Sequence, residues 1–254
     1  MSKPSLHLET DPEALAVATR DLVAQLVHEA VRQRGRFSIA LSGGSTPKRF
    51  HQLLAKTEGL PWASMHFFFG DERHVGPEDP QSNYRMAQET LLSLVPVPAE
   101  NVHRVEAEDP DAQRVATRYG AELRRFFGDA EAFPRFDVQL LGLGPDGHTA
   151  SLFPGVPEIH ESTRWVAAPW VAKLNTFRIT LTPPVLNASR AVVFLVQGAD
   201  KADAVQEVFE GTKSVNEIPS KVVQPNPGGA FWFLDAAAAA KLSDASLGRK
   251  KVRG

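Results

Sequence analysis

The sequence predicts an α/β fold: a single domain with a mainly parallel β-sheet and helices on both of its faces. Short apolar runs alternate with amphipathic segments along nearly the whole chain, which is typical of strand–helix–strand units. Three glycine-rich polar segments each follow an apolar run, where parallel sheets carry their ligand-binding loops. The chain has 254 residues, of which 43% are hydrophobic, and this is enough to bury a core.

The first element is an amphipathic helix over residues 11–34. Apolar side chains recur there at intervals of three and four residues: Leu15, Ala18, Leu22, Leu26 and Ala30. Thr10 is the expected N-cap, Pro12 fits the first turn, and Gly35 ends the helix.

A strand, a helix and a second strand follow. Residues 37–41 are an apolar run that stops at two glycines, which predicts a strand. Thr46 and Pro47 open a helix with an apolar face: Phe50, Leu53 and Leu54. Residues 65–69 are the next predicted strand.

The alternation continues through the rest of the chain. Further helices are predicted over three segments: residues 81–92, 110–127 and 201–209. Further strands are predicted over five segments: residues 102–105, 136–141, 177–181, 191–196 and 230–234. Five consecutive alanines at 236–240 are good helix formers, so a final helix is predicted over residues 236–242.

No internal repeat or linker divides the chain, so residues 1–247 are predicted to form one catalytic domain. Residues 248–254 hold four basic side chains and no apolar anchor, which predicts a flexible tail. For the oligomeric state, a monomer or a weak homo-oligomer is expected.

Composition excludes several classes of protein. The net charge of −2 and the pI of 6.5 argue against a nucleic-acid-binding protein. No stretch approaches the roughly 20 apolar residues of a membrane span, and no signal peptide is evident. The chain has no cysteine, which excludes disulfides, thiolate metal sites and thiol nucleophiles. A cytoplasmic protein is therefore expected.

The first polar segment fits a phosphate site. Gly43, Gly44, Ser45 and Thr46 lie between a predicted strand and a predicted helix. Glycines let the backbone approach a ligand closely, and the start of a helix supplies free N–H groups. The spacing is not that of a Walker A loop. The alternative is a tight turn capped by Ser45 or Thr46, and the pattern alone does not separate the two.

The second polar segment, residues 70–74, places two acids, an arginine and a histidine at the end of a buried apolar run. A charged surface turn would look similar. Its position favours a functional site, because Asp71 and Arg73 leave the core at the edge where ligands bind.

The third polar segment formally matches G-x-G-x-x-G, at Gly142, Gly144 and Gly147. No helix start or second acidic strand end accompanies it, so a dinucleotide site is not predicted. The sharper pattern is Asp146 two residues before His148, since a carboxylate can fix the tautomer of a general base.

Three cations complete this set of residues. Lys173, Arg178 and Lys201 lie near predicted element starts, and each alone is more often a solvated surface charge. Together with the glycine loop they fit the cationic half of a phosphate pocket.

These residues resemble the 6-phosphogluconolactonase family. The matching blocks are residues 41–47, 70–75, 82–84 and 142–154, with Lys201. The most specific block is Asp-Gly-His-Thr-Ala-Ser-Leu-Phe-Pro. The resemblance implies a Rossmann-like fold of the glucosamine-6-phosphate deaminase type. It also implies hydrolysis of 6-phospho-D-glucono-1,5-lactone, the second step of the oxidative pentose phosphate pathway, with no cofactor and no metal.

The resemblance also implies roles for individual residues. His148 would be the general base, oriented by Asp146, and Arg73 would stabilise the oxyanion; Asp71 would orient a substrate hydroxyl or Arg73. The phosphate would lie on the glycine loop with two counter-charges: Gly43, Gly44, Ser45, Thr46, Arg178 and Lys201.

Two alternatives stay open. The related deaminases carry a glutamate five residues after the histidine and a tyrosine where this chain has Arg73. Here the glutamate position is Phe153, which favours the lactonase. A non-catalytic sugar-phosphate sensor would normally carry a DNA-binding domain, and no segment before residue 37 fits one.

Overall fold

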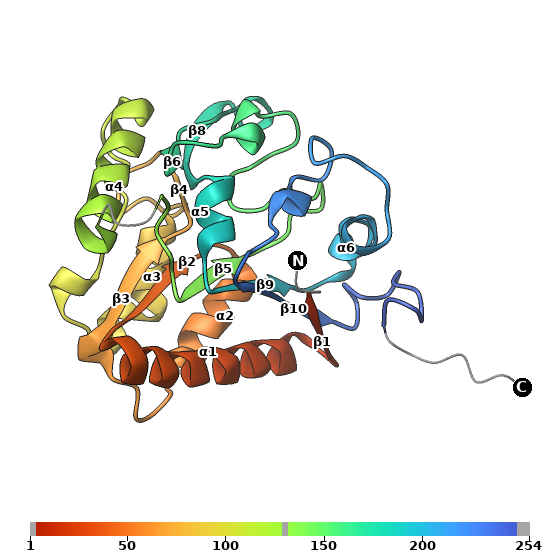
Figure 1. The fold of residues 1–254 in the computed structure, drawn as a ribbon, viewed down its shortest axis with the longest axis horizontal. Coiled ribbons are helices and arrows are strands. Elements are labelled where there is room, and N and C mark those ends of the chain that lie inside the picture. Colours follow the sequence, from red (N-terminus) through yellow and green to blue (C-terminus); the bar gives the residue numbers. More distant parts are fainter. Residues whose placement is uncertain (1–3, 129–131, 248–254) are drawn as a thin grey trace, which may run out of the picture.

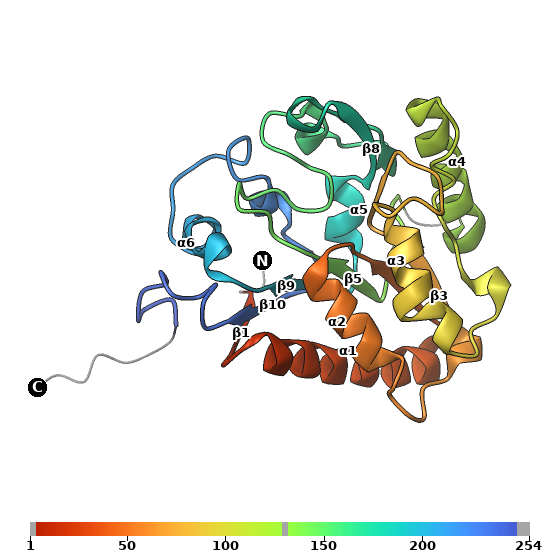
Figure 2. The same ribbon diagram turned by 180° about the vertical axis from the view of Figure 1, so that it is seen from behind.

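The computed structural model describes residues 4–128 and 132–247, and its centre is a six-stranded parallel sheet (Figures 1 and 2). The strands lie in the order β1-β10-β9-β5-β2-β3, and every neighbouring pair is parallel. Their bounds are β1 Ser5–Glu9, β2 Phe37–Leu41, β3 Met65–Phe69, β5 Val138–Leu141, β9 Ala191–Val196 and β10 Gly229–Asp235. The predicted parallel sheet is therefore confirmed.

Helices cover both faces of this sheet, as predicted. Figures 1 and 2 show α1 and α2 on one face and α5 on the other. The α-helices are α1 Pro12–Arg34, α2 Ser45–Leu54, α3 Asn83–Thr90, α4 Ala112–Phe127, α5 Pro183–Ala188 and α6 Ala202–Phe209. Short 3₁₀ turns lie at Trp62–Ser64, Leu92–Leu94, Ala99–Asn101, Pro157–His160, Ala172–Leu174 (η5), Ala199–Lys201 (η6) and Pro219–Val222.

A second, antiparallel sheet lies on the α5 side of the first (Figure 1). Its order is β4-β8-β6, with β7 also paired to β8. The bounds are β4 Asp71–Arg73, β6 Val166–Ala167, β7 Trp170–Val171 and β8 Thr176–Leu181. The strand predicted at 177–181 thus forms, but outside the parallel sheet. An apolar run specifies a strand without specifying its partner.

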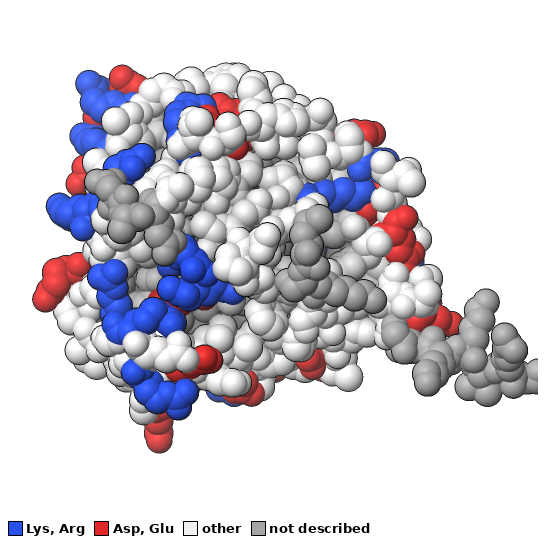
Figure 3. All heavy atoms as spheres, viewed as in Figure 1, with Lys and Arg blue, Asp and Glu red and all other residues white. Residues whose placement is uncertain are grey.

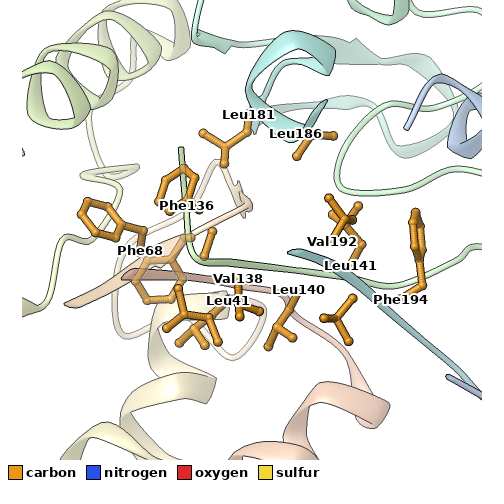
Figure 4. Close-up of a cluster of buried hydrophobic side chains, with 14 of the residues drawn as sticks. Leu41, Phe68, Phe136, Val138, Leu140, Leu141, Leu181, Leu186, Val192 and Phe194 are labelled. Atoms are coloured by element: carbon orange, nitrogen blue, oxygen red, sulfur yellow. The ribbon is translucent and has the colours of Figure 1, made fainter. Parts of the chain in front are cut away.

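The core lies between the parallel sheet and the elements that cover it. Figure 4 shows Phe68 of β3, Leu141 of β5 and Val192 of β9 on the same side of the sheet as Leu181 of β8 and Leu186 of α5. Leu41 of β2 and Leu140 of β5 point to the opposite side. The sheet edge at β3 is also covered, because the buried Tyr119 hydroxyl of α4 accepts from Phe69 N–H and donates to Phe69 C=O. This contact satisfies backbone groups that an open edge would leave unpaired.

The strand order places a switch point between β2 and β5. From β2 the chain moves outward to β3, whereas from β5 it moves the other way, through β9 to β10. Loops after two such strands diverge and leave a crevice at their carboxyl ends. Residues 42–44 and 142–148 are these two loops.

Three predictions about local structure are wrong. The N-cap of α1 is Asp11 and not Thr10, since the Asp11 carboxylate accepts from two backbone N–H groups of the first turn. Residues 102–105 make only one bridge, Phe67 to Val102, and no strand. Residues 236–241 form turns and not a helix, because a six-residue alanine-rich segment is too short to be helical by propensity alone.

Other predicted elements form with shifted ends: α3, α4, α6, β5 and β10. Lys201, predicted to start α6, lies in the 3₁₀ turn before it. The sequence prediction omitted β1, β4, β6, β7 and α5, all of which are only two to six residues long. The predicted tail at 248–254 lies outside the described residues.

Candidate active site

A cavity of about 400 Å³ opens at the switch point, between the loops that follow β2 and β5. Nine of the ten site residues predicted from the sequence line it: Gly43, Gly44, Ser45, Thr46, Asp71, Arg73, His148, Arg178 and Lys201. The tenth, Asp146, contacts His148. Segments up to 158 residues apart in the chain are brought together here because parallel strands end at the same edge.

The loop after β2 presents a helix start to this cavity. Gly44 is the N-cap of α2, and no side-chain hydrogen bond caps the helix. The alternative of a turn capped by Ser45 or Thr46 is therefore wrong, and both residues line the cavity. Gly43 is required by close packing, since a Cβ there would lie 1.9 Å from Asn83 Oδ1. Uncapped N–H groups with the positive end of a helix dipole suit an anion.

Asp146 and His148 form a short hydrogen-bonded pair. Asp146 Oδ1 lies 2.5 Å from His148 Nδ1, which leaves Nε2 of the imidazole available for other chemistry. Burial opposes ionisation of Asp146, but hydrogen bonds from His148 and Lys173 outweigh it and hold the pKa of Asp146 well below its usual range. The carboxylate is thus ionised and fixes the histidine tautomer.

The imidazole is also held through its ring face. Phe153 stacks on His148 with 4.1 Å between ring centroids and 27° between planes. The Lys173 ammonium lies 4.5 Å from the centroid of the Phe153 ring and forms an ion pair with Asp146. Residues 145–147 form a turn here, so the G-x-G-x-x-G match carries no helix and no dinucleotide site.

Asp71 enters the cavity from β4, and two neighbours hold its carboxylate. Ser151 Oγ donates to Asp71 Oδ2 over 2.6 Å, and Asn83 Nδ2 lies 3.4 Å from Asp71 Oδ1. Asn83 Nδ2 also donates to the backbone carbonyl of Asp71 over 2.9 Å. Glu72, the next residue, faces the start of α3 and accepts from the backbone N–H groups of Asn83 and Tyr84. Burial raises the pKa of Glu72, and these hydrogen bonds only partly oppose the rise. Glu72 therefore supports the fold beside the site.

Three cations line the cavity in addition to Lys173. Arg73 and Arg178 are paired residues on the antiparallel strands β4 and β8. Burial and the charge of Arg73 lower the pKa of Arg178. Two neighbouring guanidinium groups repel each other, and an anion between them relieves this repulsion. Lys201 also lines the cavity, and its Nζ lies 2.9 Å from Asp200 Oδ2.

The structure also identifies contacts that sequence reasoning missed. Ser151, Asn83 and Phe153 hold functional side chains in place, and only Phe153 had been singled out. His74 of the second polar segment does not line the cavity and instead contacts the Asp109 carbonyl. Contacts between distant segments leave no local pattern, so no spacing rule could have found them.

The described residues contain neither a candidate metal cluster nor a helix that could span a membrane. Within residues 4–128 and 132–247, no group of three or more His, Asp or Glu is placed to hold a metal ion. In the same ranges, no helix has the length and apolar character needed to cross a membrane.

Comparison with known proteins gives a consistent result. A sequence model of the family described as glucosamine-6-phosphate isomerases/6-phosphogluconolactonase matches residues 10–232. The chain is 42% identical to a 6-phosphogluconolactonase of Nostoc sp. over 242 residues, which are 95% of this chain and 99% of the relative. It is 41% identical to a 6-phosphogluconolactonase of Synechocystis sp., with 87% of this chain and 90% of the relative covered.

Solved structures agree with the sequence comparisons. The 6-phosphogluconolactonase from Trypanosoma cruzi superimposes with a TM-score of 0.86 and 31% sequence identity, covering 96% of this chain and 98% of that one.

Proposed function

The chain belongs to the glucosamine-6-phosphate isomerase/6-phosphogluconolactonase family, and on that premise we propose that it hydrolyses 6-phosphogluconolactone with His148 as general base. Its relatives at 35–42% identity carry the name of this hydrolase. The observation that carries the mechanism is the Asp146–His148 pair in the cavity at the switch point.

In this proposal His148 takes a proton from water, which attacks the C1 carbonyl of the lactone. Asp146 holds Nδ1, so the basic nitrogen is Nε2. Attack converts the carbonyl into a tetrahedral oxyanion, and the guanidinium of Arg73 stabilises this charge. The protonated His148 then returns its proton to the ring oxygen as the C1–O bond breaks, and the product is 6-phosphogluconate.

The remaining residues bind and orient the substrate. The phosphate lies at the start of α2, on Gly43, Gly44, Ser45 and Thr46. Arg178 and Lys201, which line the same cavity, neutralise its charge. Asp71, fixed by Ser151, accepts a hydrogen bond from a sugar hydroxyl. The proposed reaction needs no metal and no cofactor, because a lactone carbonyl is already electrophilic.

Deamination of glucosamine 6-phosphate is the second activity within this family, and Phe153 argues against it. The ring-opening step needs a carboxylic acid, whereas this position holds an aromatic ring that stacks on His148. A cytoplasmic location, a single catalytic domain over 1–247 and a monomeric or weakly associated state remain predictions.

The test is lactone hydrolysis by wild type and His148→Ala. Loss of a general base is expected to lower kcat by about 10²- to 10⁴-fold, with little change in KM. Circular dichroism and the unfolding midpoint control for folding. A folded His148→Ala variant with wild-type kcat would overturn the assignment, and rapid ammonia release from glucosamine 6-phosphate would overturn the choice of reaction.

A further inference from the structure

We propose that Lys173 is a positioning residue for this reaction: its ammonium group holds the Asp146 carboxylate against His148. The inference rests on the proposed lactonase function and deepens it. Lys173 lies on η5, in the connection between β7 and β8, and shares no element with Asp146 or His148. Sequence reasoning had grouped it with the phosphate-binding cations.

The first support is that the two carboxylate oxygens of Asp146 contact different side chains. Oδ1 contacts His148 Nδ1, while Oδ2 contacts Lys173 Nζ. A carboxylate held at one oxygen is free to rotate about its last bond, whereas one held at both oxygens has a fixed plane. Lys173 supplies a permanent positive charge to Asp146, whereas His148 is charged only when it is protonated.

The second support is the contact of Lys173 with the other neighbour of the histidine. The ammonium lies over the Phe153 ring, and this ring stacks on the imidazole. A cation over an aromatic face is attracted by the ring quadrupole. Lys173 therefore contacts both side chains that hold His148, one at Nδ1 and one at the ring face.

The third support is that the geometry disfavours the alternative role of Lys173, binding the substrate phosphate. A lysine that binds the substrate phosphate needs its ammonium free for the anion, but Lys173 is already paired with Asp146. Lys201 is also paired, but its partner Asp200 is 64% exposed whereas Asp146 is 30% exposed, so an anion displaces Asp200 more easily. Arg178 also lines the cavity, so the phosphate has two other counter-charges. The charge of Lys173 thus acts on the base and not on the phosphate.

Removing Lys173 is expected to shift the pH–rate profile in one direction. Removing Lys173 leaves the Asp146 charge unneutralised beside His148 and stabilises the protonated imidazole. The other charged groups that line this cavity are Asp71, Arg73, Arg178 and Lys201, and the substitution leaves them all in place. The acid limb of the pH–rate profile is therefore expected to move to higher pH.

The experiment compares wild type with Lys173→Met and Lys173→Arg. We expect Lys173→Met to lower kcat by about 10- to 100-fold, with KM within about twofold, and to shift the acid limb to higher pH. Lys173→Arg restores much of kcat, because it keeps the charge. The matched control is Lys241→Met: Lys241 is half exposed, like Lys173, and is paired with Asp203 outside the cavity.

Each remaining outcome decides the question. A raised KM with unchanged kcat and acid limb would make Lys173 a phosphate ligand and overturn the proposal. Wild-type kinetics in Lys173→Met would also overturn it. A readout that needs no turnover separates this proposal from the lactonase itself: ¹⁵N shifts of the His148 ring report where its proton lies. A protonation midpoint of His148 that moves to higher pH in Lys173→Met supports positioning even where lactone hydrolysis fails in wild type, whereas an unchanged midpoint contradicts it.

Discussion

His148 is oriented by three neighbours, two from its own segment of the chain and one from a distant connection. Asp146 lies two residues before it, Phe153 lies five residues after it, and Lys173 arrives from a different connection. Only the first of these partners has a recognisable local pattern. A general base depends on such support, because proton transfer falls steeply when the acceptor nitrogen turns away from the attacking water.

Gly144 gives a prediction at this scale. A Cβ there would lie 1.9 Å from His148 Nδ1 and 2.7 Å from Asp146 Oδ1, so Gly144→Ala must displace the pair. Its backbone conformation is open to alanine, hence the damage is expected at the site and not in the backbone. We expect kcat to fall by about 100-fold. Steady-state kinetics and the unfolding midpoint measure the two effects.

The control for this variant is Gly76→Ala. A Cβ at Gly76 meets no atom within 4 Å, and Gly76 does not line the cavity. Equal kcat values for Gly144→Ala and wild type would contradict the packing argument.

At the scale of elements, a buried histidine between α2 and α3 makes the stability of the protein depend on pH. His51 of α2 is fully buried, and its Nδ1 lies 3.2 Å from the Thr90 hydroxyl of α3. Burial lowers the pKa of His51 from 6.5 to about 4. The unfolded chain therefore binds the proton first as the pH falls, so stability present above about pH 6.5 is lost towards pH 4.

His51→Leu tests this dependence. Wild type is expected to lose about 2 kcal/mol of unfolding free energy between about pH 7 and pH 5 through this group, and His51→Leu is expected to lose that much less. Thr90 keeps a partner, since its hydroxyl also donates to the Met86 carbonyl. Urea unfolding at the two pH values measures the difference. The matched control is His28→Leu, because His28 is exposed. The prediction is refuted if the unfolding free energies of His51→Leu and wild type depend equally on pH.

At the scale of the whole molecule, a net charge of −2 conceals an uneven distribution. Figure 3 shows basic side chains gathering at the side of this face near α4, and few across its middle. Arg34, Arg36, Arg135 and Arg190 line a hollow around the buried Asp137. A separate group of cations lines the candidate active site, where an anionic substrate would bind.

This charge distribution predicts that kcat/KM depends on the salt concentration. Raising the salt from about 0.01 to 0.15 M shortens the Debye length from about 30 to 8 Å, so kcat/KM for the phosphorylated lactone should fall by about threefold or more. Arg178→Ala should reduce the slope of this plot, whereas Lys241→Met should leave it unchanged. Parallel plots for Arg178→Ala and wild type would show that Arg178 does not attract the substrate.

The sequence alone determined the class of fold and predicted the residues of the proposed site. Hydrophobic periodicity is local, so α1, β2, β3 and β9 were predicted nearly to the residue. The site residues were found because glycine loops and charged strand ends lie next to those elements. Elements of two or three residues, such as β4 and β6, carry too short a pattern to be found this way.

Only the tertiary structure decided what contacts what. The antiparallel pairing that places Arg73 beside Arg178, the Ser151 contact that fixes Asp71, and the transfer of Lys173 from the phosphate to Asp146 all join distant segments. Such contacts depend on strand partners and on packing across the switch point. A local sequence pattern contains information on neither strand partners nor long-range packing. The sequence therefore specified which reactive groups are present, and the fold specified how they are arranged.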